Sequence, residues 1–218
     1  MFTKRPLAAY LLLSLLSVSA ALANDEPTVS AISGVPEGIS EAIAASLNPD
    51  GYRVELEGAP LADFWFRKEL PLEGESEGLF GIELGAVTSS GLVGAVRFHD
   101  AWIDYRETDL NPGVYTLRYW IQPADGDHMG VSEYRDFLLV CPSDVDVDPE
   151  QLFEEEALLE LSTQASERVH PAVVAVFPIW DEVEGPSMVR NEIDQWTLAV
   201  PLADRTLGVV VEGHGDLP

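Results

Sequence analysis

The sequence predicts a mainly β protein, a β-sandwich of about eight strands with one or two helices. Short runs of β-branched and aromatic residues recur at hairpin spacing, and clusters of turn residues separate them. Few stretches have the periodicity of an amphipathic helix. The single cysteine, Cys141, excludes an intramolecular disulfide, so packing must stabilise the domain.

The first 23 residues have the pattern of a secretory signal peptide. Lys4 and Arg5 precede an apolar run over residues 7–18, and small residues follow it up to Ala23. The run is shorter than the roughly 20 residues of a membrane-spanning helix. We therefore expect cleavage after Ala23, one mature domain over residues 24–218, and a periplasmic or secreted location without membrane insertion.

Acidic residues dominate the composition. The chain has 12 Lys and Arg against 38 Asp and Glu, a formal net charge of −26. Such a surface repels phosphate backbones and anionic lipid, so we expect no nucleic-acid partner. An excess of carboxylates suits a protein that folds in salty surroundings, where screening reduces the repulsion between like charges.

The first half of the mature domain contains one predicted helix and two predicted hairpins. Residues 36–47 begin with Pro36 and place Ile39, Ile43 and Leu47 on one face, which predicts a helix. The polar residues before it are expected to be irregular. Alternation of apolar and polar residues predicts hairpins of 52–56 with 62–68 and of 80–86 with 92–98, and a further short strand at 102–105.

Residues 114–121 form the most convincing strand of the chain. They are β-branched and aromatic, with Leu117 and Tyr119 on one face and Arg118 among the large residues of the other. Large side chains on both faces indicate a central strand. The apolar residues 137–141 are predicted to be its hairpin partner.

An acidic linker follows this hairpin and ends at a predicted helix. Asp148 suits the N-cap and Pro149 the first turn, which predicts a helix near 149–166 as an insertion in the sandwich. Its acidic run is interpreted as a solvated face. Further strands are predicted at 172–177, 196–201 and 206–212.

The loop inside the central hairpin contains the most prominent group of potential ligands. Asp125, Asp127 and His128 place two carboxylates and an imidazole within four residues, and His99 ends a neighbouring strand. These groups suit a divalent metal such as copper or zinc. Alternatively, Asp125 to Asp127 form an Asp-Gly turn and His128 hydrogen-bonds loop backbone. Both interpretations stay open.

Aromatic residues offer a different kind of binding surface. Exposed aromatic rings can receive a sugar ring or a partner's side chain, although tryptophans in strands also pack in cores. The candidates for a ligand or partner surface are Trp65, Trp102, Trp120, Tyr134, Arg135 and Asp136.

No hydrolase elbow, zinc-protease motif, phosphate loop or dinucleotide fingerprint is present. The sequence therefore predicts a non-enzymatic binding protein that uses residues 125–136 to contact an unidentified ligand or protein partner. The alternatives are a copper-type metal-binding protein with His128 as ligand, a protein similar to a carbohydrate-binding module, and an enzyme whose site the sequence does not reveal.

Two resemblances add expectations. Residues 112–130, PGVYTLRYWIQPADGDHMG, resemble the C-terminal hairpin of small periplasmic copper-carrier proteins, which implies an immunoglobulin-like sandwich and copper(II) binding by His128. Here the turn is one residue longer, and the expected mature N-terminus at Asn24 has no histidine. The phrases GYRV, PGVYTLRY with DGDHMG and YRDFLL, and HPAVV resemble an uncharacterised family of secreted bacterial β-sandwich proteins. That family brings no activity with it.

Overall fold

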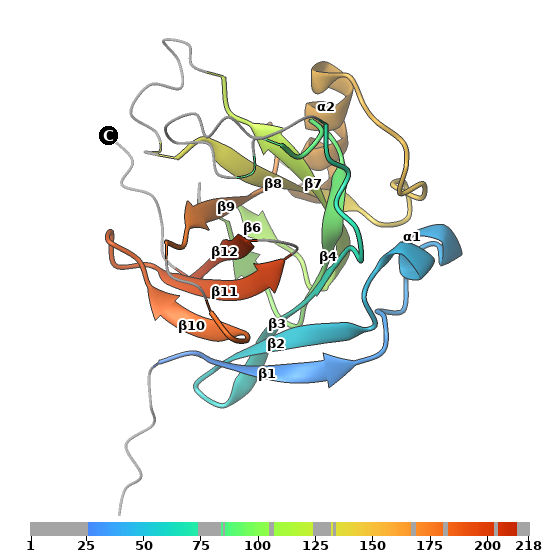
Figure 1. Cartoon of the computed structure of the whole chain (residues 1–218). Coiled ribbons are helices and arrows are strands. Elements are labelled where there is room, and N and C mark those ends of the chain that lie inside the picture. The colour runs from blue at the N-terminus through green and yellow to red at the C-terminus, as the bar shows by residue number, and fades with distance from the viewer. Residues whose placement is uncertain are drawn as a thin grey trace, which may run out of the picture.

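The protein folds around one large antiparallel sheet. The computed structural model describes residues 26–73, 84, 86–104, 107–123, 132, 134–166, 169–180, 183–202 and 205–212. In this part of the chain, ten strands are hydrogen-bonded into one sheet that is nearly closed into a barrel, and two helices lie outside it (Figure 1). The predicted signal peptide lies outside the described residues.

The elements follow one another along the chain as β1 (Thr28–Ser33), α1 (Glu41–Ser46), β2 (Asp50–Leu56), β3 (Ala59–Phe66), β4 (Leu92–Phe98), β5 (Trp102–Ile103), β6 (Asp109–Leu110), β7 (Gly113–Ile121), β8 (Asp136–Pro142), α2 (Glu155–Ser166), β9 (Val173–Pro178), β10 (Ser187–Arg190), β11 (Trp196–Leu202) and β12 (Arg205–Glu212).

The order of strands in the sheet is β1-β2-β3-β4-β7-β8-β9-β12-β11-β10. The first seven of these are neighbours in sequence order, apart from the separate β5–β6 pair. The last three strands run back, so that β12 pairs with β9, which is a Greek-key connection. β1 and β10 are the two free edges, and they approach each other without a hydrogen-bonded ladder.

The inside of the sheet is a packed apolar core. Strand residues alternate between the two faces, and every second residue points inward. In β7, Leu117 and Tyr119 join the interior cluster, as their predicted shared face requires. Apolar side chains from the other strands fill the same space, among them Phe64, Phe66, Val96, Leu138, Val140, Val174, Val176, Leu198, Val200 and Val209.

The two helices cover different parts of the outer face (Figure 1). Ile43 in α1 is fully buried and packs in a cluster with Trp65 of β3. Leu158 and Leu161 in α2 pack in a second cluster with Phe137 of β8. Each helix therefore shields apolar side chains that alternation sends to the outside of the sheet.

The mainly β composition is confirmed, and so are the 52–56 with 62–68 hairpin, the central position of residues 114–121 and their pairing with residues 137–141. The predicted immunoglobulin-like sandwich of about eight strands is not confirmed, because hydrogen bonds connect ten strands in a single sheet. A sandwich and a curled sheet both give strands with one inward face, so alternation does not separate them.

Three local predictions in the first half of the chain were wrong. α1 begins at Glu41 instead of Pro36, since Ser40 is its N-cap and accepts a hydrogen bond from the Ile43 amide at 3.1 Å. β4 pairs along its two edges with β3 and β7, which leaves no edge for the predicted partner, residues 80–86; of these, 80–83 and 85 lie outside the described residues. β1 forms in a stretch expected to be irregular.

Candidate functional site

The predicted metal-binding loop is described only at its stem. Asp125, Asp127 and His128 lie outside the described residues. At the stem, the Gln122 amide donates to the Arg135 carbonyl at 2.8 Å, and Arg135 Nε donates to the Gln122 carbonyl at 2.7 Å. Arg135 therefore closes the hairpin. The proposed role of the loop itself stays a prediction.

The residues beside this stem take part in the fold. Asp136 is 1% exposed, and its Oδ1 accepts hydrogen bonds from the Tyr119 hydroxyl at 2.8 Å and from the Leu84 amide at 2.9 Å. Tyr134 is partly buried, and its ring meets the ring of Phe177 edge-on at 4.7 Å. In this arrangement Asp136 is inaccessible to a ligand.

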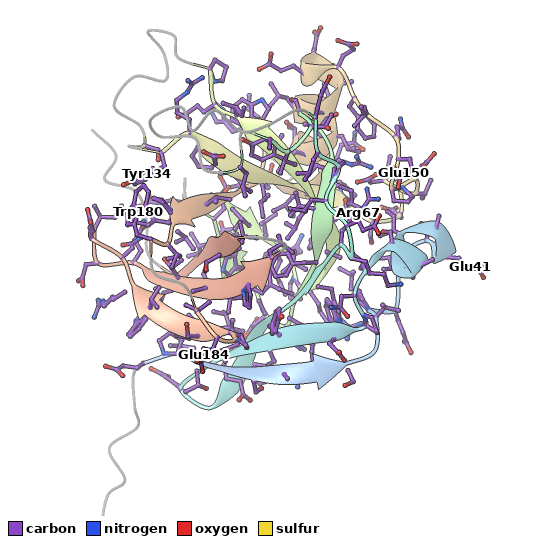
Figure 2. The ribbon with its side chains drawn as sticks, viewed as in Figure 1. Glu41, Arg67, Tyr134, Glu150, Trp180 and Glu184 are labelled. Carbon is purple, nitrogen blue, oxygen red and sulfur yellow. The ribbon has the colours of Figure 1, made fainter. Side chains whose placement is uncertain are left out.

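The tryptophans expected on the surface are buried. Trp65, Trp102 and Trp120 are 3%, 6% and 7% exposed. Their burial does not support an exposed aromatic platform. Trp180, which the sequence did not single out, is 73% exposed (Figure 2). Each buried indole N–H has a protein acceptor, namely the carbonyls of Gly34 and Val211 and the carboxylate of Glu155.

His99 is held by a buried carboxylate. Its Nε2 lies 2.8 Å from Oδ2 of Asp63, which is 1% exposed. Arg53 donates from Nε and Nη2 to the two oxygens of Asp63 at 2.7 and 2.8 Å. Burial raises the pKa of Asp63, but the hydrogen bonds from Arg53 and His99 outweigh it, so the pKa is lowered overall. The described residues contain no group of three metal-ligating side chains.

The most elaborate polar arrangement is centred on Arg118, which is fully buried on the outer face of β7. Its Nε and Nη2 donate to the two carboxylate oxygens of Asp146, both at 2.6 Å. Its remaining N–H groups reach the carbonyls of Ser90, Gln151 and Asp148 at 2.8, 2.7 and 2.8 Å. All five N–H donors of a guanidinium are therefore satisfied.

Arg118 holds residues 143–154, here called the anchored segment, against the barrel. The Phe153 ring lies over the guanidinium, with Cζ 4.7 Å from the ring centroid. Ser40 Oγ donates to the Val147 carbonyl at 2.6 Å, and Arg67 Nη2 lies 2.6 Å from a Glu150 carboxylate oxygen (Figure 2). The segment is thus irregular in backbone but fastened along its length.

This fastening explains why α2 begins at Glu155 and not near Pro149. The carbonyls of Asp148 and Gln151 accept hydrogen bonds from Arg118, and Asp148 Oδ1 accepts one from the Glu150 amide at 3.0 Å. These contacts form a turn instead of a first helical turn. These contacts cannot be predicted from local sequence patterns, because Arg118 lies 30 and 33 residues before Asp148 and Gln151.

The anchored segment and α2 present an acidic surface with exposed apolar side chains, here called the acidic surface. Val145, Val147 and Leu152 are 53%, 47% and 54% exposed. A shallow groove of about 820 Å³ lies along α2 and is lined in part by Leu159 and Pro171. Residues 142–166 contain no lysine or arginine, and besides the buried Asp146 they contain Asp144, Asp148, Glu150, Glu154, Glu155, Glu156 and Glu160.

Comparison of the chain with protein-family models, curated proteins and solved structures finds no match. Both resemblances read from the sequence therefore stay predictions. Among the described helices, neither has the length and apolar character needed to cross a bilayer.

Proposed function

We propose that this protein is an exported, non-enzymatic binding protein that docks a basic, amphipathic segment of a protein partner on its acidic surface. One observation carries the proposal: Arg118 uses all five of its N–H groups, and in doing so holds an irregular, exposed segment in one conformation. The leader pattern of residues 1–23 supports export.

The buried ion pair favours a role beyond stability. Moving Arg118 and Asp146 out of water carries a desolvation penalty, and apolar residues of similar size often stabilise a fold as well as such a pair does. What apolar residues would not do is bind three backbone carbonyls at once. The pair therefore specifies the path of the anchored segment, and a fixed segment loses less conformational entropy when a partner binds.

The chemistry of the surface indicates the kind of partner. Val145, Val147 and Leu152 would gain by being covered with apolar side chains. The carboxylates around them, with no basic residue between 142 and 166, favour lysine or arginine on the partner. A segment with both features is a basic amphipathic helix or strand. The barrel interior is filled by side chains, so the ligand is expected on the outside.

A short synthetic peptide of lysine and leucine at helical spacing is the probe. We expect the protein to bind this peptide. The affinity should fall as salt is added, because salt screens the attraction between the lysines of the peptide and the carboxylates of the protein. The variant Val145→Ser, Val147→Ser, Leu152→Ser should bind about tenfold more weakly or worse, since tenfold is only about 1.4 kcal/mol of lost apolar contact. Fluorescence anisotropy of the labelled peptide measures both effects.

A matched variant separates docking from general attraction to an acidic protein. Leu72→Ser, Ile103→Ser, Ile193→Ser removes three apolar side chains that are 56%, 48% and 49% exposed elsewhere. It should bind the peptide as the unmodified protein does. Equal affinities for the two triple variants would refute the proposal and leave only non-specific charge attraction.

A further inference from the structure

A second arginine has the opposite character to Arg118. Arg97 in β4 is partly exposed, and its guanidinium lies over the Trp65 ring, with Cζ 5.9 Å from the ring centroid. Within the described part of the chain, its guanidinium forms no ion pair or hydrogen bond. This is unusual for a protein with 38 acidic residues, because carboxylates are available nearly everywhere on its surface.

Arg97 belongs to a row of polar residues that crosses four strands. Ser30 of β1 pairs with Arg53 of β2, Arg53 pairs with Asp63 of β3, and Asp63 pairs with Arg97 of β4. Residues directly opposite in neighbouring strands share a face and have Cβ atoms roughly 5 Å apart. His99, two residues after Arg97, reaches back to Asp63 at 2.8 Å. The row therefore places two guanidinium groups and an imidazole on the same face of the sheet, around the carboxylate of Asp63.

Much of the donor capacity in this row is unused. Arg53 binds Asp63 through Nε and Nη2, and Nη1 has no acceptor among the residues that the structure describes. All five N–H groups of Arg97 are free of protein acceptors in the described residues. The side chains of Arg53 and His99 are 32% and 26% exposed, so the free donors are within reach of solvent. The Trp65 ring covers one face of the Arg97 guanidinium and so limits the directions from which a ligand can approach it.

The charge of the row matches a monovalent oxyanion. Arg53 and Arg97 contribute two positive charges and the paired Asp63 one negative charge, so one positive charge is uncompensated. Glu55, which interacts with Arg53 through charge, offsets this remaining charge, so the attraction for an anion comes from the unpaired guanidinium of Arg97 and not from the net charge of the region. A carboxylate, with one charge and two oxygens for a guanidinium fork, fits better than a dianionic phosphate, which the negative protein would repel more strongly.

We infer that the outer face of β2, β3 and β4 carries a binding site for a carboxylate group, in which the free guanidinium of Arg97 is the principal donor and Arg53, held by Asp63, is the second. The site lies apart from the anchored segment, and it stands or falls independently of the proposed docking surface.

The probe is acetate, titrated against chloride at constant ionic strength and neutral pH. The side-chain Nε–Hε signals of Arg97 and Arg53 in a ¹⁵N-labelled sample report the binding. We expect these signals to shift and reach a plateau. Arg97→Gln should weaken the acetate affinity about tenfold or more, because charge-assisted hydrogen bonds are lost. Arg97→Lys should keep the charge but recover only part of the affinity.

Arg190→Gln is the matched control, since it removes the same charge from an exposed arginine on β10 that already has an Asp194 partner. It should leave the acetate curve unchanged, and the backbone spectra of all variants show whether each is folded. A linear response without a plateau, or equal curves for Arg97→Gln and Arg190→Gln, would overturn the inference. Phosphate binding as tightly as acetate would overturn the assignment to a carboxylate.

Discussion

Replacing Asp146 by alanine perturbs the anchored segment at its most buried point. Both side chains of the Arg118–Asp146 pair are fully buried, and the carboxylate also accepts a hydrogen bond from Thr116 Oγ1 at 2.5 Å. The substitution removes the two short hydrogen bonds to Arg118. It leaves a buried guanidinium without its counter-ion, which is the more serious change because a charge in an apolar environment is strongly disfavoured.

The expected loss in the free energy of unfolding is about 3 to 5 kcal/mol, the usual consequence of removing one partner from a buried ion pair. For a domain of this size, each kcal/mol lowers Tm by about 2 to 4 °C, so Tm should fall by roughly 6 to 20 °C. The double variant Arg118→Met with Asp146→Ala removes the unpaired charge. It should therefore be more stable than Asp146→Ala, although the Ser90 carbonyl loses its donor.

Urea unfolding followed by tryptophan fluorescence measures the global change, and amide hydrogen exchange over 143–154 measures the local one. We expect faster exchange in that segment for both variants, because each lacks the anchor. A loss below about 1 kcal/mol in Asp146→Ala together with unchanged exchange would refute the anchoring role. So would a double variant whose loss equals the sum of the two single losses, since independent sites add.

Two further predictions concern buried and partly buried titratable groups. Burial raises the pKa of the Cys141 thiol, so a disulfide reagent should label it only on unfolding, and rapid labelling of the native protein would contradict its place in β8. The pKa of Asp63 is lowered in the folded state, so its carboxylate stabilises the protein above the unfolded pKa of about 4, and this is lost as pH falls through the folded pKa. Asp63→Asn should flatten the acid limb of the stability curve, and an unchanged slope below about pH 4 would argue against the Arg53 and His99 contacts.

The strands could be predicted because a strand has a local sequence pattern, the alternation of side chains between its two faces. Residues 114–121 carry large side chains on both faces of the strand. In the structure Leu117 and Tyr119 point into the interior core, and Arg118 is buried on the outer face of the sheet. No local sequence pattern indicates that the sheet curls and nearly closes. Whether β12 adds to β9 or to another sheet depends on a pairing between strands far apart in sequence, and a predicted sandwich has the same alternation.

The binding surfaces were harder to predict for a related reason. Trp65 and Trp120 were predicted to be surface aromatics because they alternate along their strands with residues that face inward. Only the packing of α1 and α2 shows that the outer face of the sheet is also covered. Asp146 was one aspartate among many in an acidic linker, and its partner lies 28 residues earlier in the chain. The composition of the linker does not distinguish the one carboxylate that the fold buries.

Arg118 and Arg97 both lie on the outer face of the sheet, and they differ in whether the protein itself uses their hydrogen-bond donors. Every N–H donor of Arg118 has an acceptor within the protein, and its guanidinium is buried. Its role is therefore to set the conformation of the anchored segment. Arg97 satisfies none of its donors within the described residues, although the chain has more than three carboxylates for each basic residue. In a chain with so many acidic residues, an arginine left without a carboxylate requires a reason. Either neighbouring acids are kept away by the strand register around Trp65, or a carboxylate from outside the protein takes the place, and the acetate titration decides between them.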